Sequence, residues 1–154
     1  MCVDYLANKN IINNRFLVPQ IVDIFDKLQG STYYNRIDLK RGYHQIRIVP
    51  KDIHKTAFRT QTGLYEYLVM PFGIINALAT FNQLMDRIFC KYFSFTGVFF
   101  DNINVYSKML EEQKEHLSKV FHKLQEHKLH VNSKKSDFFL KEIHYFVTLS
   151  QRMG

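Results

Sequence analysis

The stretch that decides the fold is residues 98–106, Val-Phe-Phe-Asp-Asn-Ile-Asn-Val-Tyr, taken together with residues 36–45, Arg-Ile-Asp-Leu-Lys-Arg-Gly-Tyr-His-Gln. Each stretch places an aspartate, Asp101 or Asp38, beside β-branched and aromatic residues, which are typical of strands. The two aspartates lie 63 residues apart in the sequence. They can meet only if their strands are neighbours in one sheet, and such paired carboxylates are typical of metal-dependent phosphoryl transfer.

The composition is that of a globular domain with a basic surface. A chain of 154 residues fits one domain with a sizeable core. Its content of 46% apolar and 15% aromatic residues argues against disorder. Lys and Arg outnumber Asp and Glu by 21 to 14, giving a net charge of +7. This balance favours a polyanionic partner such as nucleic acid.

The cysteines and histidines indicate no disulfide framework and no zinc site. Cys2 and Cys90 are the two cysteines, and the seven histidines are scattered, so we expect a reducing, intracellular setting without assigning it to cytoplasm or nucleus. No apolar run has the length that a membrane span needs, and we expect no membrane partner.

The first half of the chain is expected to contain one helix and several strands. Pro19 ahead of an apolar periodicity that ends at Gly30 predicts a helix. Alternation predicts strands at residues 37–39, 45–49, 55–60 and 65–69, with a turn at 50–52.

The second half is expected to add two helices and to complete the sheet. Asn76 is expected to cap a helix whose apolar stripe is best explained by core packing; the stripe comprises Phe81, Leu84, Met85, Ile88, Phe89 and Tyr92. Residues 98–106 predict a β-hairpin with Asp101 and Asn102 at its tip.

Ser107 is expected to cap a third helix with Glu111 and Glu112 in its first turn. Its buried face is predicted to hold Leu110, Leu117, Phe121 and Leu124, and strands at 129–131 and 143–149 are predicted to follow. The order of elements predicts an α+β fold with helices on one face of an antiparallel sheet.

The candidate chemistry is two-metal phosphoryl transfer. Such a site holds two Mg²⁺ ions roughly 3.5–4 Å apart, and Mg²⁺ prefers carboxylate oxygens. Asp38 at a strand end and Asp101 at a hairpin tip are suitable ligands. Aspartates at such positions also cap turns, and the spacing alone leaves both interpretations open.

Several motifs in register resemble the reverse transcriptases of Ty3/gypsy-type LTR retrotransposons. They are residues 2–5 (Cys-Val-Asp-Tyr), 37–48 (Ile-Asp-Leu-Lys-Arg-Gly-Tyr-His-Gln-Ile-Arg-Ile), 55–60 (Lys-Thr-Ala-Phe-Arg-Thr), 70–73 (Met-Pro-Phe-Gly), 76–81 (Asn-Ala-Leu-Ala-Thr-Phe), 99–102, 106–108 (Tyr-Ser-Lys) and 141–142 (Lys-Glu). The resemblance covers essentially the whole chain. It implies a fragment of the Pol polyprotein: a polymerase palm with partial fingers and no thumb, in which residues 1–36 and 44–75 are fingers-like and 37–43 and 76–150 form the palm.

The resemblance also implies an RNA-directed DNA polymerase that adds dNTPs to a primer 3′-hydroxyl with two Mg²⁺ ions. Asp38, Asp101 and position 102 are the implied catalytic residues, and the implied metal ligands are Asp38, the Leu39 backbone carbonyl and Asp101. The implied dNTP-binding residues are Lys40, Arg41, Gly42, Tyr43, Phe72 and Gly73, with Lys135 near the leaving pyrophosphate. The implied partners are template-primer nucleic acid, dNTPs and the remaining Pol segments, thumb and RNase H.

The chain departs from the family pattern at the catalytic box. Asn102 stands where the family has an aspartate, so weak or absent activity is expected. Asn104 replaces an apolar strand residue and would be costly if buried without a partner. Plainer interpretations also exist, in which Tyr43 is core, and Arg41 and Lys135 are surface charges. The alternative function is a non-catalytic remnant that binds nucleic acid or protein, and a third possibility is a fragment that does not fold alone.

Overall fold

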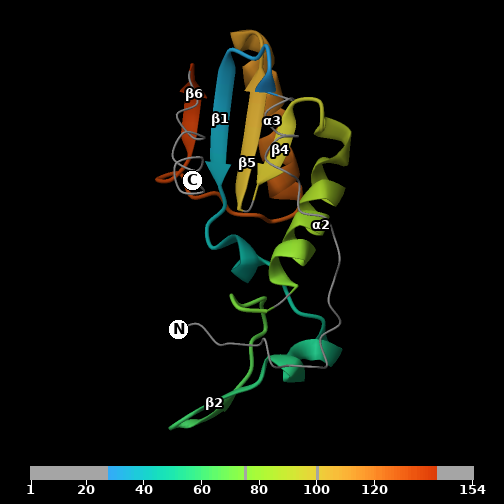
Figure 1. Ribbon diagram of the computed structural model, residues 1–154, viewed down its shortest axis with the longest axis vertical. Coiled ribbons are helices and arrows are strands. Elements are labelled where there is room, and N and C mark those ends of the chain that lie inside the picture. The colour runs from blue at the N-terminus through green and yellow to red at the C-terminus, as the bar shows by residue number, and fades with distance from the viewer. Residues whose placement is uncertain (1–27, 75, 100, 142–154) are drawn as a thin grey trace, which may run out of the picture.

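An antiparallel sheet of four strands, called the central sheet below, makes up one end of the molecule (Figure 1). The computed structural model describes residues 28–74, 76–99 and 101–141. The strand order is β4-β5-β1-β6, and the strands are β4 (Thr96–Phe99), β5 (Asn102–Ser107), β1 (Tyr33–Asp38) and β6 (Asp137–Leu140). A separate hairpin of β2 (Phe58–Thr60) and β3 (Gly63–Tyr65) lies at the opposite end of the molecule from this sheet.

The register of the two central strands fixes which residues face the core. Ile37 of β1 lies opposite Ile103 of β5, and both side chains are fully buried. The next pair, Asp38 opposite Asn102, is only partly buried. Because successive side chains in a strand point to opposite faces, this alternation separates an apolar face from a polar one.

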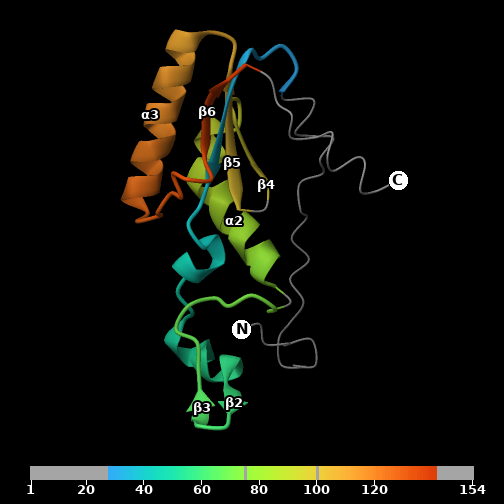
Figure 2. The same cartoon turned by 90° about the vertical axis from the view of Figure 1, so that its left-hand side faces the viewer.

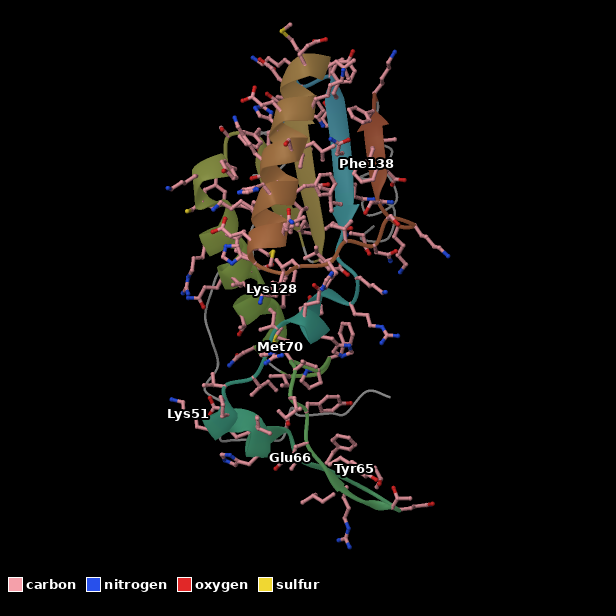
Figure 3. All side chains as sticks on the ribbon, turned by 180° about the vertical axis from the view of Figure 1, so that it is seen from behind. Lys51, Tyr65, Glu66, Met70, Lys128 and Phe138 are labelled. Carbon is pink, nitrogen blue, oxygen red and sulfur yellow. The ribbon has the colours of Figure 1, made fainter. Side chains whose placement is uncertain are left out.

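Two helices cover the apolar face of the sheet, as the sequence predicts. Helix α2 (Ala77–Phe89) contacts β4, α3 (Leu110–Glu126) contacts β5 and β1, and the two helices contact each other. Figures 2 and 3 show α3 lying along one side of the sheet. The fully buried side chains between these layers include Phe81, Met85, Phe89, Val105, Val120 and Leu124. The predicted α+β architecture is therefore confirmed.

The hairpin at residues 98–106 is also confirmed, as the pair β4–β5. Asn104 is half-buried on β5, between Arg36 of β1 and Gly97 of β4. The full cost of a buried orphan amide therefore does not apply to it.

Residues 42–56 contradict the predicted strands. Gln45 ends a 3₁₀ helix, η1 (Gly42–Gln45), and Arg47 pairs with Val69 in a single bridge instead of a ladder. A second 3₁₀ helix, η2 (Pro50–Thr56), replaces the predicted turn and the start of the predicted 55–60 strand. Proline suits the first turn of a helix because its missing N–H needs no partner there. Strand β3 ends at Tyr65, so the strand predicted at 65–69 is wrong except for the bridge at Val69.

The ends of both long helices differ from the prediction. Asn76 precedes α2, but its side chain forms no capping hydrogen bond. Ser107 is not a cap: it ends β5, and α3 begins three residues later after Met109. The Ser107 hydroxyl instead lies 2.7 Å from Nδ1 of His116. The first turn of α3 does hold Glu111 and Glu112. Phe121, expected to be buried on α3, is 37% exposed.

The chain after α3 forms a strand that the sequence did not predict. Residues 129–131 contribute only a bridge, Leu39 to Val131, whereas β6 forms the edge of the sheet. Arg36 of β1 forms a salt bridge with Asp137 of β6, and the Asn35 side-chain oxygen accepts the Phe139 amide at 2.6 Å. The strand predicted at 143–149 and most of the helix predicted between Pro19 and Gly30 lie outside the described residues.

No helix within 28–74, 76–99 and 101–141 combines the length and apolar character needed to cross a membrane.

Candidate active site

The two predicted carboxylates meet at one end of the central sheet. Asp38 is the last residue of β1 and lies directly opposite Asn102, the first residue of β5. The Leu39 amide donates a hydrogen bond of 3.2 Å to the backbone carbonyl of Asp101. Strand pairing therefore brings together Asp38, Leu39, Asp101 and Asn102, although residues 38 and 101 are remote in the sequence.

The electrostatics of this end of the sheet favour a cation. Partial burial and the nearby Asp101 carboxylate raise the pKa of Asp38, and the charge of Lys135 and a hydrogen bond from the Asn132 side chain oppose that rise. Two neighbouring carboxylates repel each other, and a bound cation relieves that repulsion. Their oxygen donors match a hard divalent cation.

The donor set is short of one carboxylate. In the described part of the chain, no group of three or more His, Cys, Asp and Glu residues could hold a metal ion. Asn102 offers an amide oxygen where a third carboxylate would complete such a group. The residues present therefore fit a hard divalent cation, with one negative charge fewer than an all-aspartate site.

A loop after α3 holds the backbone of Asp38 through hydrogen bonds. The Asn132 amide donates to the Asp38 carbonyl at 2.8 Å, and the Asp38 amide donates to the Ser136 hydroxyl at 3.0 Å. Ser136 in turn donates to the Asn132 carbonyl at 2.8 Å. This loop places Lys135 within electrostatic reach of Asp38. Sequence reasoning singled out Lys135 but missed Asn132 and Ser136, because nothing in the local pattern links residues almost a hundred positions apart.

The turn after β1 packs tightly against the carboxylate pair. Gly42 is buried, and a Cβ atom built on it would lie 3.2 Å from the Phe81 ring and 3.5 Å from Cβ of Asp101. Arg41 just before it has a φ of 53°, in the left-handed region that is unfavourable for residues with a side chain. Residue 42 therefore has to be small for the turn to approach Asp101.

Tyr43 and Phe72 form an aromatic group beside the same turn. Their ring centroids lie 5.1 Å apart in an edge-to-face arrangement, and Tyr43 also lies 5.1 Å from Phe81. Burial and the Asp101 charge raise the pKa of the Tyr43 phenol. Phe72 is 48% exposed, and the neighbouring Gly73 has a φ of 96°. The structure thus brings Gly42 and Tyr43 next to Asp101, with Phe72 packed against Tyr43.

A basic pocket of about 610 Å³ opens beside this turn. It is lined by Lys40, Arg41, His44, Gln45, His130 and Val131. The lining thus includes one lysine, one arginine and two histidines and no acidic residue. Lys40 and Arg41 were predicted from sequence, whereas His44, Gln45 and His130 were missed. Gln45 gave a signal that could have been used, because it is a polar residue inside a stretch predicted to be a strand.

The comparisons with known sequences point in one direction. The family model described as "Reverse transcriptase (RNA-dependent DNA polymerase)" matches residues 2–147. An "RNA-directed DNA polymerase homolog" of Oenothera berteroana is 41% identical over 122 residues, which is 76% of this chain and 86% of that protein. The "Transposon Tf2-7 polyprotein" of Schizosaccharomyces pombe is 37% identical over 147 residues, covering 94% of this chain but 11% of the polyprotein.

Solved structures agree with the sequence matches. The foamy viral protease-reverse transcriptase in complex with double-stranded DNA is similar with a TM-score of 0.86 and 26% identity, covering 94% of this chain and 26% of that chain. The same kind of protein in complex with an RNA/DNA hybrid is similar with a TM-score of 0.84 and 25% identity, covering 92% of this chain and 19% of that chain. The chain thus spans about a quarter or less of these solved chains, and about a tenth of the transposon polyprotein.

Proposed function

The chain belongs to the reverse transcriptase (RNA-dependent DNA polymerase) family, and from this premise we propose that Asp38 and Asp101 form a weakened nucleotidyl-transfer site. The predicted resemblance is confirmed, and the chain is a reverse-transcriptase domain homologous to RNA-directed DNA polymerases, with an α+β fold consistent with a polymerase palm fragment. Family membership implies a divalent metal cofactor in general.

The observation that carries the proposal is the register of β1 and β5. Because Asp38 pairs with Asn102 and the Leu39 amide bonds to Asp101, the two carboxylates share one end of the sheet. We assign Asp38, Asp101 and the Leu39 backbone carbonyl as ligands of two Mg²⁺ ions. Such ions, when bound, activate the attacking oxygen and stabilise the leaving phosphate.

The nucleotide is proposed to bind at the turn after β1. Lys40, Arg41 and Gly42 would contact the triphosphate, and Tyr43 would lie against the sugar. Phe72 and Gly73 lie in the neighbouring loop and would help to hold the template and the nucleotide. The edge-to-face packing of Tyr43 on Phe72 supports this assignment, because it places the two predicted contact groups side by side.

Lys135 is proposed to act on the side of the leaving pyrophosphate. Its charge already acts on the Asp38 carboxylate. A lysine at this position would favour the extra negative charge that develops on the leaving group.

The division of the chain follows from the same assignment. Residues 1–36 and 44–75 are proposed to be fingers-like, and 37–43 and 76–150 to be the palm. Strand β1 connects the first fingers-like range to the palm, and the β2–β3 hairpin belongs to the second. Template-primer, dNTPs and the thumb and RNase H segments of a longer polyprotein are the proposed partners.

Asn102 is proposed to make the site weak. One charge–charge interaction at about 4 Å is worth roughly 4 kcal/mol at an effective dielectric constant near 20. If that stabilisation is lost only in the transition state, the rate falls by about three orders of magnitude. Water and the remaining ligands screen the charge, so three orders of magnitude is an upper bound.

The experiment is primer extension by the unmodified chain and by Asn102→Asp, with Mg²⁺, a DNA primer on an RNA template and all four dNTPs. We expect Asn102→Asp to raise the rate of the first nucleotide addition by about ten- to a thousandfold. Asn102→Asp combined with Asp38→Asn is the control, and it should return the rate to background. Asn104→Asp adds the same charge two residues along β5 and should leave the rate unchanged.

Primer extension that persists in the variant with both Asn102→Asp and Asp38→Asn would contradict the catalytic role of Asp38. No extension by Asn102→Asp, in a chain whose circular dichroism shows a cooperative thermal transition, would favour a non-catalytic remnant that keeps the fold.

A further inference from the structure

The side chain of Gln45 bridges two segments that are 85 residues apart. Its amide nitrogen donates to the Lys40 carbonyl at 2.7 Å and to the His130 carbonyl at 3.0 Å. Its amide oxygen accepts the His130 backbone N–H at 2.7 Å. One side chain therefore bonds both backbone polar groups of His130 and one of Lys40.

Both N–H groups of the Gln45 side-chain amide are therefore hydrogen-bonded. An amide NH₂ group has two N–H donors, and each has a partner here. The reverse orientation of the amide would place its oxygen against two carbonyls and its NH₂ against an N–H, so the surroundings define one orientation. The Gln45 side chain bonds to both the N–H and the carbonyl of His130, as the backbone of a neighbouring strand would. His130 directly precedes Val131, which forms a β-bridge with Leu39.

The segment that Gln45 holds is the proposed nucleotide-binding turn. Lys40 begins that turn, and its amide donates to the His130 carbonyl at 2.9 Å. Arg41 adopts the unfavourable left-handed conformation, and Gly42 lies against Phe81 and Asp101. A backbone of this shape persists only where its surroundings over-determine it. Gln45, at the end of the 3₁₀ helix that follows Arg41, supplies such a constraint through its bonds to Lys40 and His130.

We propose that Gln45 is a positioning residue, which holds the Lys40–Tyr43 turn in its nucleotide-binding shape by bridging it to the backbone of His130. The proposal rests on the proposed nucleotide-binding role of this turn. It gives a role to a polar side chain that touches neither carboxylate. The bridge also sets one wall of the basic pocket, because Lys40, Gln45 and His130 all line it.

The test variant is Gln45→Met, which keeps the length of the side chain and removes all three hydrogen bonds. It is made in the Asn102→Asp chain, and Gln125→Met on the exposed side of α3 is the matched control. We expect Gln45→Met to raise the KM for dNTP at least fivefold with less than a twofold change in kcat. Gln125→Met should change neither parameter, because Gln125 is exposed on α3. A general loss of folded protein would lower kcat and leave KM unchanged, so a rise in KM is specific to the turn.

Amide hydrogen exchange gives a second readout that needs no catalysis. The His130 N–H donates to Gln45, so its exchange should accelerate at least tenfold in Gln45→Met and remain unchanged in Gln125→Met. A Gln45→Met chain with unaltered exchange at His130 would overturn the bridge. Accelerated exchange with an unaltered KM would overturn the positioning role.

A failed polymerase assay is distinguishable from a failed bridge. If Asn102→Asp adds no nucleotide, the proposed function fails, and dNTP affinity is then measured by equilibrium dialysis with radiolabelled dNTP. In that case, at least fivefold weaker binding by Gln45→Met supports the positioning role, and equal binding or no binding by either chain overturns it.

Discussion

Gly42→Ala tests whether the close approach of the turn to the carboxylate pair is required. The new Cβ atom would lie 3.2 Å from the Phe81 ring, and carbon atoms pack best at about 3.5–4.0 Å. Phe81 is fully buried and packs against Tyr43, so its ring has little room to move. The excess of a few tenths of an ångström must therefore displace the turn or Asp101, which lies 3.5 Å from the new atom.

The magnitude follows from the two consequences of that displacement. Overpacking a core by one methyl group costs about 1 kcal/mol at the low end of the usual range. For a chain of this size, that loss lowers Tm by roughly 2–4 °C. Because a misplacement of about 1 Å can cost about a hundredfold in rate, a shift of a few tenths of an ångström is expected to slow nucleotide addition by about tenfold.

Gly30→Ala is the matched control for stability. Gly30 has a φ of +77° and nothing within 4 Å of an added Cβ atom. Alanine there is strained only through its backbone, at a cost of roughly 1 kcal/mol. Both variants should therefore melt at similarly reduced temperatures, followed by circular dichroism.

Primer extension then separates the two variants. In the Asn102→Asp chain, Gly42→Ala should be about tenfold slower than Gly30→Ala at a temperature where both are folded. Equal rates for the two variants would refute the requirement for close approach. An unchanged Tm for Gly42→Ala would refute the packing argument.

Two further predictions concern the helix that covers the sheet. Lys128, just after the end of α3, has a φ of 56°. The Leu129 amide donates to the Leu124 carbonyl at 2.8 Å, and the Lys128 amide donates to the Gln125 carbonyl at 3.0 Å. These two bonds form a Schellman motif, which favours glycine at position 128. Lys128→Gly should therefore raise the free energy of unfolding by about 1 kcal/mol, whereas the same change at Lys114 inside α3 should lower it by about 1 kcal/mol; urea unfolding measures both, and equal signs would contradict the assignment. Burial and the Lys119 charge lower the pKa of His116, whose ring stacks 3.8 Å from Phe95, so the unfolded chain binds the proton more readily. The contribution of His116 to the free energy of unfolding should be fully present above its unfolded pKa of about 6.5 and should decline as the pH falls below that value. Between about pH 7.5 and about pH 5, Tm should therefore fall more in the unmodified chain than in His116→Gln. Parallel curves of Tm against pH would contradict this prediction.

Local sequence patterns determined much of the architecture. The hairpin at 98–106 and the stripe on α2 depend on periodicities of two and 3.6 residues, which any single segment displays by itself. The position of Asp101 near a hairpin tip follows from the same local pattern. The motif resemblance then joined Asp38 to Asp101, and the register of β1 and β5 agrees with that pairing.

Local patterns failed where a distant segment decides the conformation. Residues 45–49 alternate like a strand, but Gln45 ends a 3₁₀ turn and bonds to His130. Ser107 has the chemistry of a helix cap, yet strand pairing with Tyr33 keeps it in β5. In both places a long-range contact outweighs a weak local preference.

The sequence by itself determined the class of the fold and the family, and it singled out Asp38 and Asp101 as candidate carboxylates. Only the tertiary structure decided which distant groups hold the segments around the site: the Asn132 amide and the Ser136 hydroxyl bond to the backbone of Asp38, and the Gln45 side chain bridges Lys40 to His130. The physical reason is the range of the interactions. Hydrophobic periodicity is written along each segment, whereas a hydrogen bond between residues 85 positions apart exists only after β1 and the chain following α3 have come together.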